Sequence, residues 1–475
     1  MDYRVCIIGA GTAGLGVAKQ LLVHEKVPLS EIIIVDDSTG VGGLWNRDNR
    51  VFETVGVTSC VCSGSPVYDD LHTNLPKDSM AFSDFRYPIE SVHYPSHTTV
   101  LSYLKAYAQK FVSTQCVQFN TSVRQVRKIN DKWTVTCCVK DKDTASNNRT
   151  MSFTTKYVVV CTGHYRHPLI PFFKESSHVN SCIKRIHSSA FRHPSAFTQY
   201  KRILVVGSRS SAKDICLLLR KTGQNIYVTI RGGMENMSRG RQSFFRPVIS
   251  QGARQRGELE FINHQTGEVT SRAVLRCGES YQQPSAGNNR HRDTEQGSVK
   301  DTIDLIIYAT GYVNKYPFLE DSGLNDPFTI SSPSDSDSDS SVSDDSHSDA
   351  GGDKTTDHWS TCTGEIPLLH RIVALADPTL MFTGTLNHLL SPGIVLEYQA
   401  RYAAQLISGK IHLPYNFSSL LNAFIRAKTI ASGEREKYST TRKEKTILVG
   451  EERVDISEFF MDANLELSHN PLYCK

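Results

Sequence analysis

Two glycine turns, each between an apolar strand pattern and a helical pattern, are the parts of this chain best suited to bind a ligand. In the first, Gly9 permits a tight turn, Gly11 lets the backbone approach a pyrophosphate, and Gly14 lets the following helix pack on the strand. The N-terminus of that helix offers free N–H groups to phosphate oxygens. Asp36 ends the next strand pattern, where a carboxylate would bind ribose hydroxyls. We therefore predict a dinucleotide site that suits FAD, with a purely structural turn as the alternative, formed by Gly9, Ala10, Gly11, Thr12, Ala13, Gly14 and Asp36.

The second turn starts at Gly207 and has Arg209 where the first turn has its middle glycine. Taken alone, it could equally be an ordinary connection between a strand and a helix. Arg231 ends the next strand pattern, at the place that Asp36 takes in the first unit. An arginine there suits a ribose 2′-phosphate, so this turn suits NADPH, although Arg231 could also be a solvated cation. The predicted contacts of the second site are Gly207, Ser210, Ser211, Ala212, Asp214 and Arg231.

Alternating strand and helix patterns surround these two turns and indicate an α/β fold. Apolar runs over 4–8, 31–35, 203–206 and 226–230 predict strands, and helical patterns cover 15–23 and 212–219. A third β-rich region covers 132–139 and 151–160. The two turns therefore start two similar units, each of which can bind one nucleotide.

Composition excludes several other classes of protein. The 475 residues carry 53 Lys and Arg against 49 Asp and Glu, which is too even for a protein that binds nucleic acid through a basic face. No apolar run is long enough to span a membrane, and no signal peptide is recognisable. The twelve cysteines form no short-spaced framework, and no His, Cys and Asp cluster has metal-ligand spacing. We expect a cytoplasmic protein without a metal or a membrane span.

One segment, residues 331–354, is rich in Ser and Asp and has almost no large apolar side chain. Such a composition cannot bury enough surface to offset the entropy of ordering, so the sequence predicts disorder there. The segment is either a tolerated loop insertion or an acidic tract that accepts phosphate groups.

Further along the chain, several motifs resemble those of the flavin-containing monooxygenases. Gly42-Gly43-Leu44-Trp45 is similar to the family's GG-x-W, and residues 68–78 and 80–85 look like its TNLPK and FSDF run. Residues 160–164 and 304–312 resemble the two ATG-type segments that connect the domains of the family. The resemblance covers most of the chain outside the acidic segment.

This resemblance implies two Rossmann-like domains, an FAD domain over 1–163 and 312–475 and an NADPH domain inserted at 164–311. NADPH would reduce FAD, and oxygen would add to the flavin as a C4a-hydroperoxide that oxygenates a soft sulfur or nitrogen nucleophile. Asn74 matches the family's functional asparagine and is the expected catalytic residue. The resemblance adds as cofactor contacts Gly43, Leu44, Trp45, Thr73, Asn74, Leu75, Thr162, Gly163, Thr310 and Gly311.

Departures from the family pattern keep alternatives open. The identifying string FxGxxxHxxx[F/Y] has Ser181 and Ile183 in place of its Phe and Gly, but keeps His187 and Phe191. With Arg209, these changes would fit a flavoprotein that has lost catalysis. A Baeyer–Villiger monooxygenase shares the cofactors but generally has Trp at the position of Phe191. The closest alternative with two dinucleotide sites, a flavin-linked disulfide reductase, would need a C-x-x-C motif that is absent.

Three histidines lie in or near the motifs. We expect His187 to connect the two domains through hydrogen bonds, whereas His164 and His72 are weaker candidates for contact with flavin. The partners would be O2 and a small-molecule substrate, and the sequence identifies neither that substrate nor the oligomeric state.

Overall fold

The computed structural model describes residues 1–47, 65–140, 148–171, 174–175, 182–230, 239–256, 259–272, 298–319, 368–386, 391–413, 446–449 and 452–455. Arg231, Ser181 and the predicted disordered segment 331–354 lie outside these residues. No helix in the described ranges has the length and apolar character needed to cross a membrane.

The first of two parallel sheets is built around the N-terminal strand. β1 (Asp2–Ile8) lies between β2 (Ile32–Val35) and β6 (Asn148–Val160), and both pair with it in parallel. β20 (Leu380–Phe382), from far along the chain, pairs in parallel with the other side of β6. Ile32 to Val35 are all buried, as expected for a strand covered on both faces. The strand patterns predicted over 4–8 and 31–35 are confirmed.

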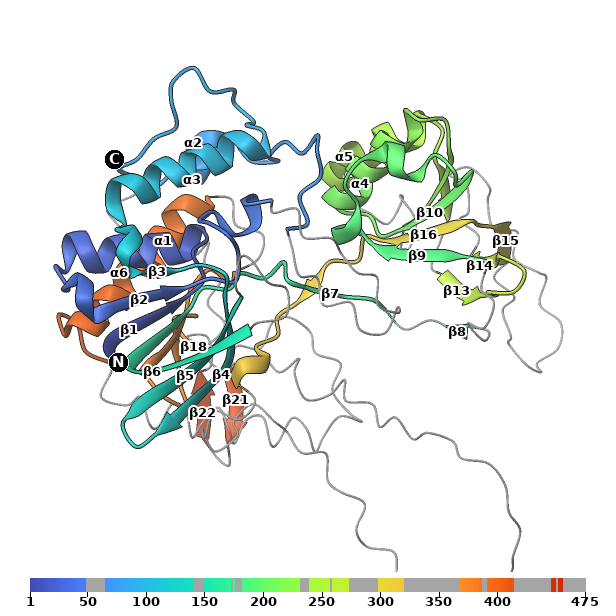
Figure 1. Cartoon of the computed structure of the whole chain (residues 1–475). Coiled ribbons are helices and arrows are strands. Elements are labelled where there is room, and N and C mark those ends of the chain that lie inside the picture. Colours follow the sequence, from blue (N-terminus) through green and yellow to red (C-terminus); the bar gives the residue numbers. More distant parts are fainter. Residues whose placement is uncertain are drawn as a thin grey trace, which may run out of the picture.

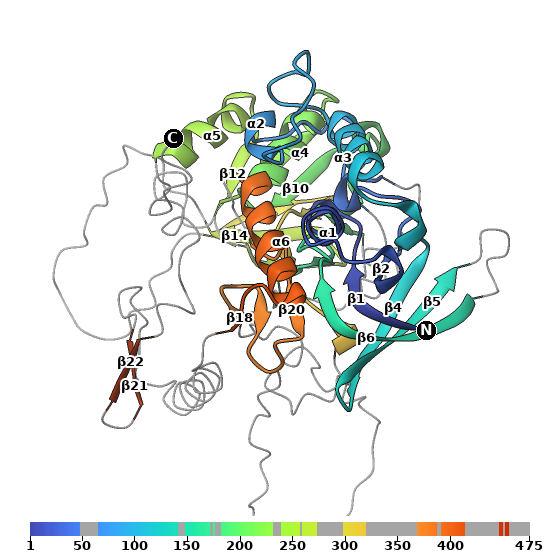
Figure 2. The same ribbon diagram turned by 90° about the vertical axis from the view of Figure 1, so that its left-hand side faces the viewer.

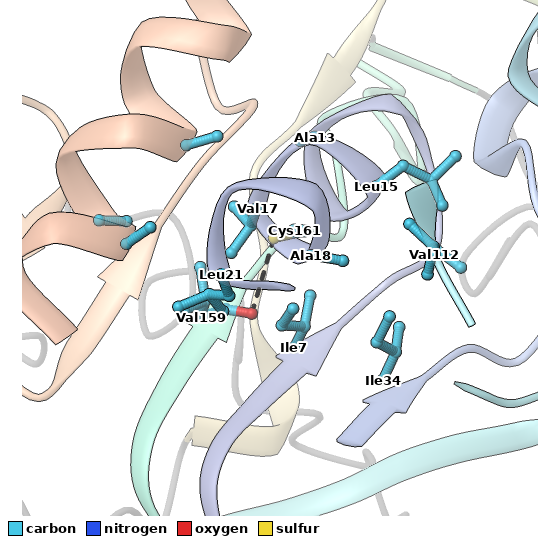
Figure 3. Packing of buried hydrophobic residues seen from close by; sticks show 14 of the residues in the cluster. Ile7, Ala13, Leu15, Val17, Ala18, Leu21, Ile34, Val112, Val159 and Cys161 are labelled. Atoms are coloured by element: carbon cyan, nitrogen blue, oxygen red, sulfur yellow. Dashed lines mark hydrogen bonds between the residues drawn. The ribbon is translucent and has the colours of Figure 1, made fainter. Parts of the chain in front are cut away.

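Helices cover one face of this sheet. α1 (Thr12–Lys19) continues as the π-helix η1 (Gln20–His24) and packs against α6 (Pro392–Ser408), while α3 (His97–Phe111) covers its other flank (Figure 2). Figure 3 shows the core between α1 and the sheet, where Leu15 and Leu21 lie over Ile7 and Ile34. The predicted helix over 15–23 starts earlier, at Thr12, directly after the glycine turn.

The opposite face is covered by the antiparallel strands β4 (Thr121–Ile129) and β5 (Lys132–Lys140), and β5 pairs with β6. The fully buried Trp133 fills the space between these strands and the sheet, beside Cys6 and Val35. The third β-rich region predicted from the sequence is therefore divided between two layers. Residues 132–139 form β5 in the layer that closes this face, and residues 151–160 form β6 of the parallel sheet, while β4 was not predicted.

The second parallel sheet has the order β12-β11-β10-β16-β9. These strands are β9 (Lys184–His187), β10 (Arg202–Val206), β11 (Asn225–Thr229), β12 (Arg254–Arg256) and β16 (Leu305–Tyr308). One face carries α4 (Ser210–Arg220) and α5 (Arg239–Ser250) (Figure 1). The other packs against a four-stranded sheet of β8 (Lys174–Glu175), β13 (Leu259–Ile262), β14 (Glu268–Arg272) and β15 (Ser298–Thr302).

Two chain crossings join these units. β7 (His167–Pro168) and β17 (Tyr312–Val313) pair antiparallel between the two sheets (Figure 1). All strands of the second sheet come from residues 184–308, while the first sheet takes strands from before and after that range. The predicted fold class, an α/β fold with one Rossmann-like unit inserted in another, is confirmed.

The remaining elements are short. They are η2 (Leu29–Glu31), η3 (Gly43–Trp45), α2 (Lys77–Met80), η4 (Thr114–Cys116), β3 (Val117–Gln118), η5 (Ser188–Ala190), η6 (Pro194–Phe197), η7 (Pro317–Leu319), β18 (Leu368–Leu369), β19 (Val373–Ala374), β21 (Thr446–Val449) and β22 (Glu452–Asp455).

Candidate cofactor-binding cleft

A cleft of about 1260 Å³ brings together the two glycine turns and the two crossing segments. The charged side chains on its wall are mostly cationic. The cations are Arg124, Arg166, Arg209 and Lys315, and the anions are Asp36 and Asp37. Such a balance suits ligands that carry phosphate groups. The predicted residues found on the wall are Gly9, Gly11, Thr12, Ala13, Asp36, Gly43, Leu44, Trp45, Thr73, Asn74, Leu75, Thr162, Gly163, Gly207, Ser210, Ser211, Thr310 and Gly311.

The first turn is held between its own helix and the first crossing segment. Gly9 has a φ of +111°, and a Cβ there would lie 2.6 Å from the carbonyl oxygen of Cys161. A Cβ on Gly14 would lie 1.9 Å from the carbonyl oxygen of Gly9. Glycine is therefore required at both positions, and the close packing of helix on strand expected from Gly14 is present.

Asp36 supports the turn and also faces the cleft. Its Oδ2 accepts a hydrogen bond from the backbone N of Ala10 at 2.6 Å, and its Oδ1 accepts from the backbone N of Ser38 at 2.8 Å. Burial raises the pKa of this carboxyl, while these hydrogen bonds favour its ionised form. A carboxylate fixed in this way can accept hydrogen bonds from a ribose on the cleft side.

The GG-x-W motif packs directly on the first turn. Gly43 has a φ of +53°, and a Cβ there would lie 2.8 Å from the Cα of Gly11. The backbone N of Gly42 donates to the carbonyl of Ala10 at 3.0 Å. This contact leaves no room for a side chain at Gly43, and Leu44 and Trp45 follow it along the cleft wall.

The second turn repeats the first against the second crossing segment. Gly207 has a φ of +127°, and a Cβ there would lie 2.4 Å from the carbonyl oxygen of Ala309. The backbone N of Gly207 donates to Thr229 Oγ1 at 3.2 Å. Thr229 is therefore a supporting residue that the sequence reasoning missed, although its place at the end of the second strand was a usable signal.

Arg209 does not distort this turn. Its φ of −105° and ψ of −169° lie close to the −79° and −170° of Gly11, in an extended region open to any residue. The departure from the glycine pattern thus leaves the backbone path unchanged and places a guanidinium on the cleft wall.

Four of the predicted cofactor contacts are absent from the cleft wall, and the structure gives each a supporting place instead. Ala10 bonds to Asp36, and Gly14 packs on the first turn. Ala212 is fully buried in the core of the second unit. Asp214 points away from the cleft and accepts a hydrogen bond from the hydroxyl of Tyr68 at 2.6 Å.

Asn74 lies on the cleft wall with its side chain exposed, and it makes no hydrogen bond to other described residues. The backbone around it is fixed by its neighbours. The N–H of Thr73 donates to the carbonyl of Pro95 at 3.0 Å, and that of Lys77 donates to the carbonyl of His93 at 2.9 Å. The amide of Asn74 is thus held at the cleft with its donors and acceptor available to a ligand.

His187 connects the second sheet to the second crossing segment. Its partners Ser189 and Gly311 both lie within 164–311, so these bonds do not join the two predicted domains directly. The Nδ1 atom accepts from the backbone N of Ser189 at 3.1 Å, so Nε2 carries the proton and donates to the carbonyl of Gly311 at 3.0 Å. Burial lowers the pKa of His187 to about 4, which keeps the ring neutral. The same Gly311 carbonyl accepts from the N–H of Leu169 at 2.9 Å, which joins both crossings.

The other two histidines differ in position. His164 lies on the cleft wall with its Nδ1 atom 3.3 Å from the carbonyl oxygen of Gly384. His72 is exposed off the wall, with Nδ1 3.1 Å from the carbonyl oxygen of Asp70. Of these two histidines, only His164 is therefore placed where it could contact a ligand in the cleft.

Ile183, the second departure in the identifying string, is buried among Leu204, Ile262 and Val269 in the core behind the second sheet. The side chain of Ile183 is part of this core, and the strands of the second sheet keep the order given above. Phe191 is fully buried, and its ring stacks on that of Phe197 at a centroid distance of 5.2 Å.

Among the residues that the structure describes, no group of His, Cys, Asp and Glu could hold a metal ion.

The sequence analysis also did not predict an ion pair on the wall of the cleft. Arg166, in the first crossing segment, pairs with Asp37, the residue after the predicted ribose carboxylate. Both side chains line the cleft. Neighbouring acids at the end of a strand were visible in the sequence, but nothing there indicated which cation would pair with the second.

Comparison with known proteins gives three consistent results. A family model described as "Flavin-binding monooxygenase-like" matches residues 2–248. "Flavin-containing monooxygenase 2" of Homo sapiens is 28% identical over 364 residues, which cover 68% of this chain and 64% of that protein. "Flavin-containing monooxygenase FMO GS-OX1" of Arabidopsis thaliana is 28% identical over 331 residues, 67% of this chain and 62% of that protein. The chain thus spans less than two thirds of these relatives.

A solved structure titled "Structure of S-allyl-L-cysteine S-oxygenase from Allium sativum" matches with a TM-score of 0.61 and 22% identity. The match covers 91% of this chain and 83% of that one. At this identity the likeness establishes the fold, including the inserted second unit.

Proposed function

Because the chain belongs to the flavin-binding monooxygenase-like family, we propose that it binds FAD and NADPH and uses O2 to oxygenate small molecules with a soft sulfur or nitrogen nucleophile. One observation carries this proposal. Both glycine turns, both crossing segments and the Asn74 loop line a single cleft, so a nicotinamide and a flavin can meet beside Asn74.

The first turn would hold FAD. Its helix N-terminus and Gly11 suit the pyrophosphate, the carboxylate of Asp36 suits the ribose, and Leu44 and Trp45 offer apolar surface. The wall is open at Gly163, where a Cβ would have no atom within 4 Å. When bound and reduced, the flavin would supply the oxygen chemistry, which the family resemblance assigns to a hydroperoxide at C4a.

The second turn would hold NADPH in the same way, with Gly207 for the tight bend and Ser210 and Ser211 at the N-terminus of α4. Gly311 also faces open space at the cleft, since a Cβ there would have no atom within 4 Å. The role of Arg231 in binding a 2′-phosphate stays a prediction from the sequence.

Asn74 is the proposed catalytic residue. Its amide can donate to and accept from groups at the flavin and the nicotinamide, and the fixed backbone of Thr73 and Lys77 holds it there. Exclusion of water once the two cofactors fill the cleft would direct oxygen to the substrate.

The test measures product from purified protein loaded with FAD, supplied with NADPH and O2. The probes are methyl phenyl sulfide and N,N-dimethylaniline, with a cyclic ketone as the third. We expect sulfoxide or N-oxide that depends on NADPH. Ester formation from the ketone alone would instead indicate a Baeyer–Villiger monooxygenase. Bound FAD without NADPH oxidation, with or without probes, would contradict the enzyme and favour the catalytically silent flavoprotein. The cytoplasmic location stays a prediction.

A further inference from the structure

A segment before Asn74 belongs to the first unit by sequence but packs on the second. We call residues 65–71 the bridging segment. Tyr68 is 6% exposed and lies in the hydrophobic core of the second unit, with its ring edge against Phe191 at a centroid distance of 6.0 Å. In Figure 1 the blue chain that leads to α2 runs between α3 and α4. The bridging segment therefore connects the two units in addition to the two crossings.

Three hydrogen bonds attach this segment to the second unit. The hydroxyl of Tyr68 donates to Asp214 Oδ2 at 2.6 Å, and Asp214 lies on α4 one turn after the residues that line the cleft. Arg192 Nη2 donates to the carbonyl of Ser65 at 2.6 Å, and the Arg192 carbonyl accepts from the N–H of Asp69 at 3.0 Å. The segment is thus attached to the second unit at Ser65, Tyr68 and Asp69.

The same segment also contacts the first site. The hydroxyl of Ser65 donates to the carbonyl of Leu44, in the GG-x-W motif, and both residues line the cleft. At the other end, the carbonyl of Leu71 accepts from the N–H of His97 at 3.0 Å, just before Thr73 and Asn74. The path from α4 to Asn74 is therefore short and held by hydrogen bonds throughout.

We propose that Tyr68 and Asp214 are positioning residues, which hold the bridging segment on α4 and thereby place the Asn74 amide at the cleft. This inference rests on the proposed function and deepens it, because the second unit, whose α4 also starts the proposed NADPH site, then helps to fix Asn74 together with the contacts to Pro95 and His93. Loss of the Tyr68–Asp214 bond should loosen the Asn74 loop, while folding and FAD binding persist.

The experiment compares Tyr68→Phe with a matched control, Tyr227→Phe. Tyr227 is also buried in the second unit, and its hydroxyl accepts from Arg254 Nη1 at 3.0 Å, away from both the bridging segment and the cleft wall. Each variant loses one buried hydroxyl. Asp214→Leu removes the acceptor, and Asp214→Asn keeps an amide oxygen in its place.

The first readout is hydrogen exchange of the peptide over 72–77 in the FAD-loaded protein, which needs no turnover. We expect exchange at Thr73 and Lys77 to rise roughly tenfold or more in Tyr68→Phe and Asp214→Leu. Asp214→Asn should recover most of the protection, and Tyr227→Phe should match the wild type. Protection of 72–77 that is equal in Tyr68→Phe and Tyr227→Phe would overturn the proposal.

The second readout is the share of consumed NADPH that appears as H2O2 instead of methyl phenyl sulfoxide. We expect this share to rise several-fold in Tyr68→Phe and Asp214→Leu but not in Tyr227→Phe. If the wild type forms no oxygenated product, the proposed function fails, and hydrogen exchange still decides the positioning role. Unchanged coupling in an active Tyr68→Phe variant would contradict that role directly.

Discussion

Gly207 allows a test of whether the second turn binds NADPH through its backbone geometry. An alanine in the left-handed helical region costs about 1–2 kcal/mol, and at a larger positive φ its strain is at least as great. At Gly207, where φ is +127°, the new Cβ would also lie 2.4 Å from the carbonyl oxygen of Ala309. Relief of such a contact requires backbone shifts, which cost about 1–3 kcal/mol more. Gly223, with a φ of +88° and no atom within 4 Å of its Cβ, is the matched control because an alanine there meets only the first cost.

The turn can relieve the clash by moving away from Ala309, and binding of NADP+ must then restore its position. We expect the dissociation constant for NADP+, measured by titration calorimetry on FAD-loaded protein, to rise roughly 5- to 150-fold in Gly207→Ala relative to Gly223→Ala. The FAD content should stay at the wild-type level, since the turn moves away from Ala309 and leaves both crossings in place. Equal NADP+ affinity in the two variants would refute the assignment of this turn to the nucleotide.

Three further predictions concern single side chains. Asn74→Ala should keep its FAD but form roughly 100-fold less oxygenated product, as measured by product chromatography; unchanged product formation would exclude Asn74 from the chemistry. Arg231→Ala should raise the Michaelis constant for NADPH much more than that for NADH, and an unchanged preference would contradict a 2′-phosphate contact. His187 has its pKa lowered from 6.5 to about 4 by burial, so the unfolded chain binds more protons between these values. The neutral ring therefore contributes about 3 kcal/mol to the free energy of unfolding above pH 6.5, and this contribution is lost as the pH falls towards 4. His187→Gln should flatten the curve of unfolding free energy against pH over this range.

Local patterns were sufficient to predict the strands on either side of both turns, and the turns themselves, but not the strands that complete each parallel sheet. Gly9 is recognisable because the tight turn after the strand needs a φ of +111°, and the strand over Ile32–Val35 is apolar throughout because both of its faces are covered. The family motifs added Asn74, which the structure places on the wall of the same cleft, while its role stays a prediction. These features rest on short-range rules that a single sequence records directly.

Contacts between distant residues could not be predicted in this way. Asp214 follows Ser210 and Ser211 in the motif, but one helical turn later its side chain faces Tyr68, which is 146 positions away in the chain. Arg209 looked like a defect because the pattern compares residue types, whereas its extended φ and ψ need no glycine. In both cases the missing information was the direction in which a side chain leaves the backbone.

The two turns share one further property that ties the cofactor sites to the connection between the units. Gly9 packs on the carbonyl of Cys161 in the first crossing segment, and Gly207 packs on the carbonyl of Ala309 in the second. These crossings are joined to each other through the Gly311 carbonyl, which accepts from Leu169 and from His187. A shift of either crossing would therefore move the backbone under a glycine turn, because neither contact has space to absorb it. Binding at one turn can in this way alter the other, which makes the crossings, together with the bridging segment, the place where substitutions should change both cofactor affinities at once.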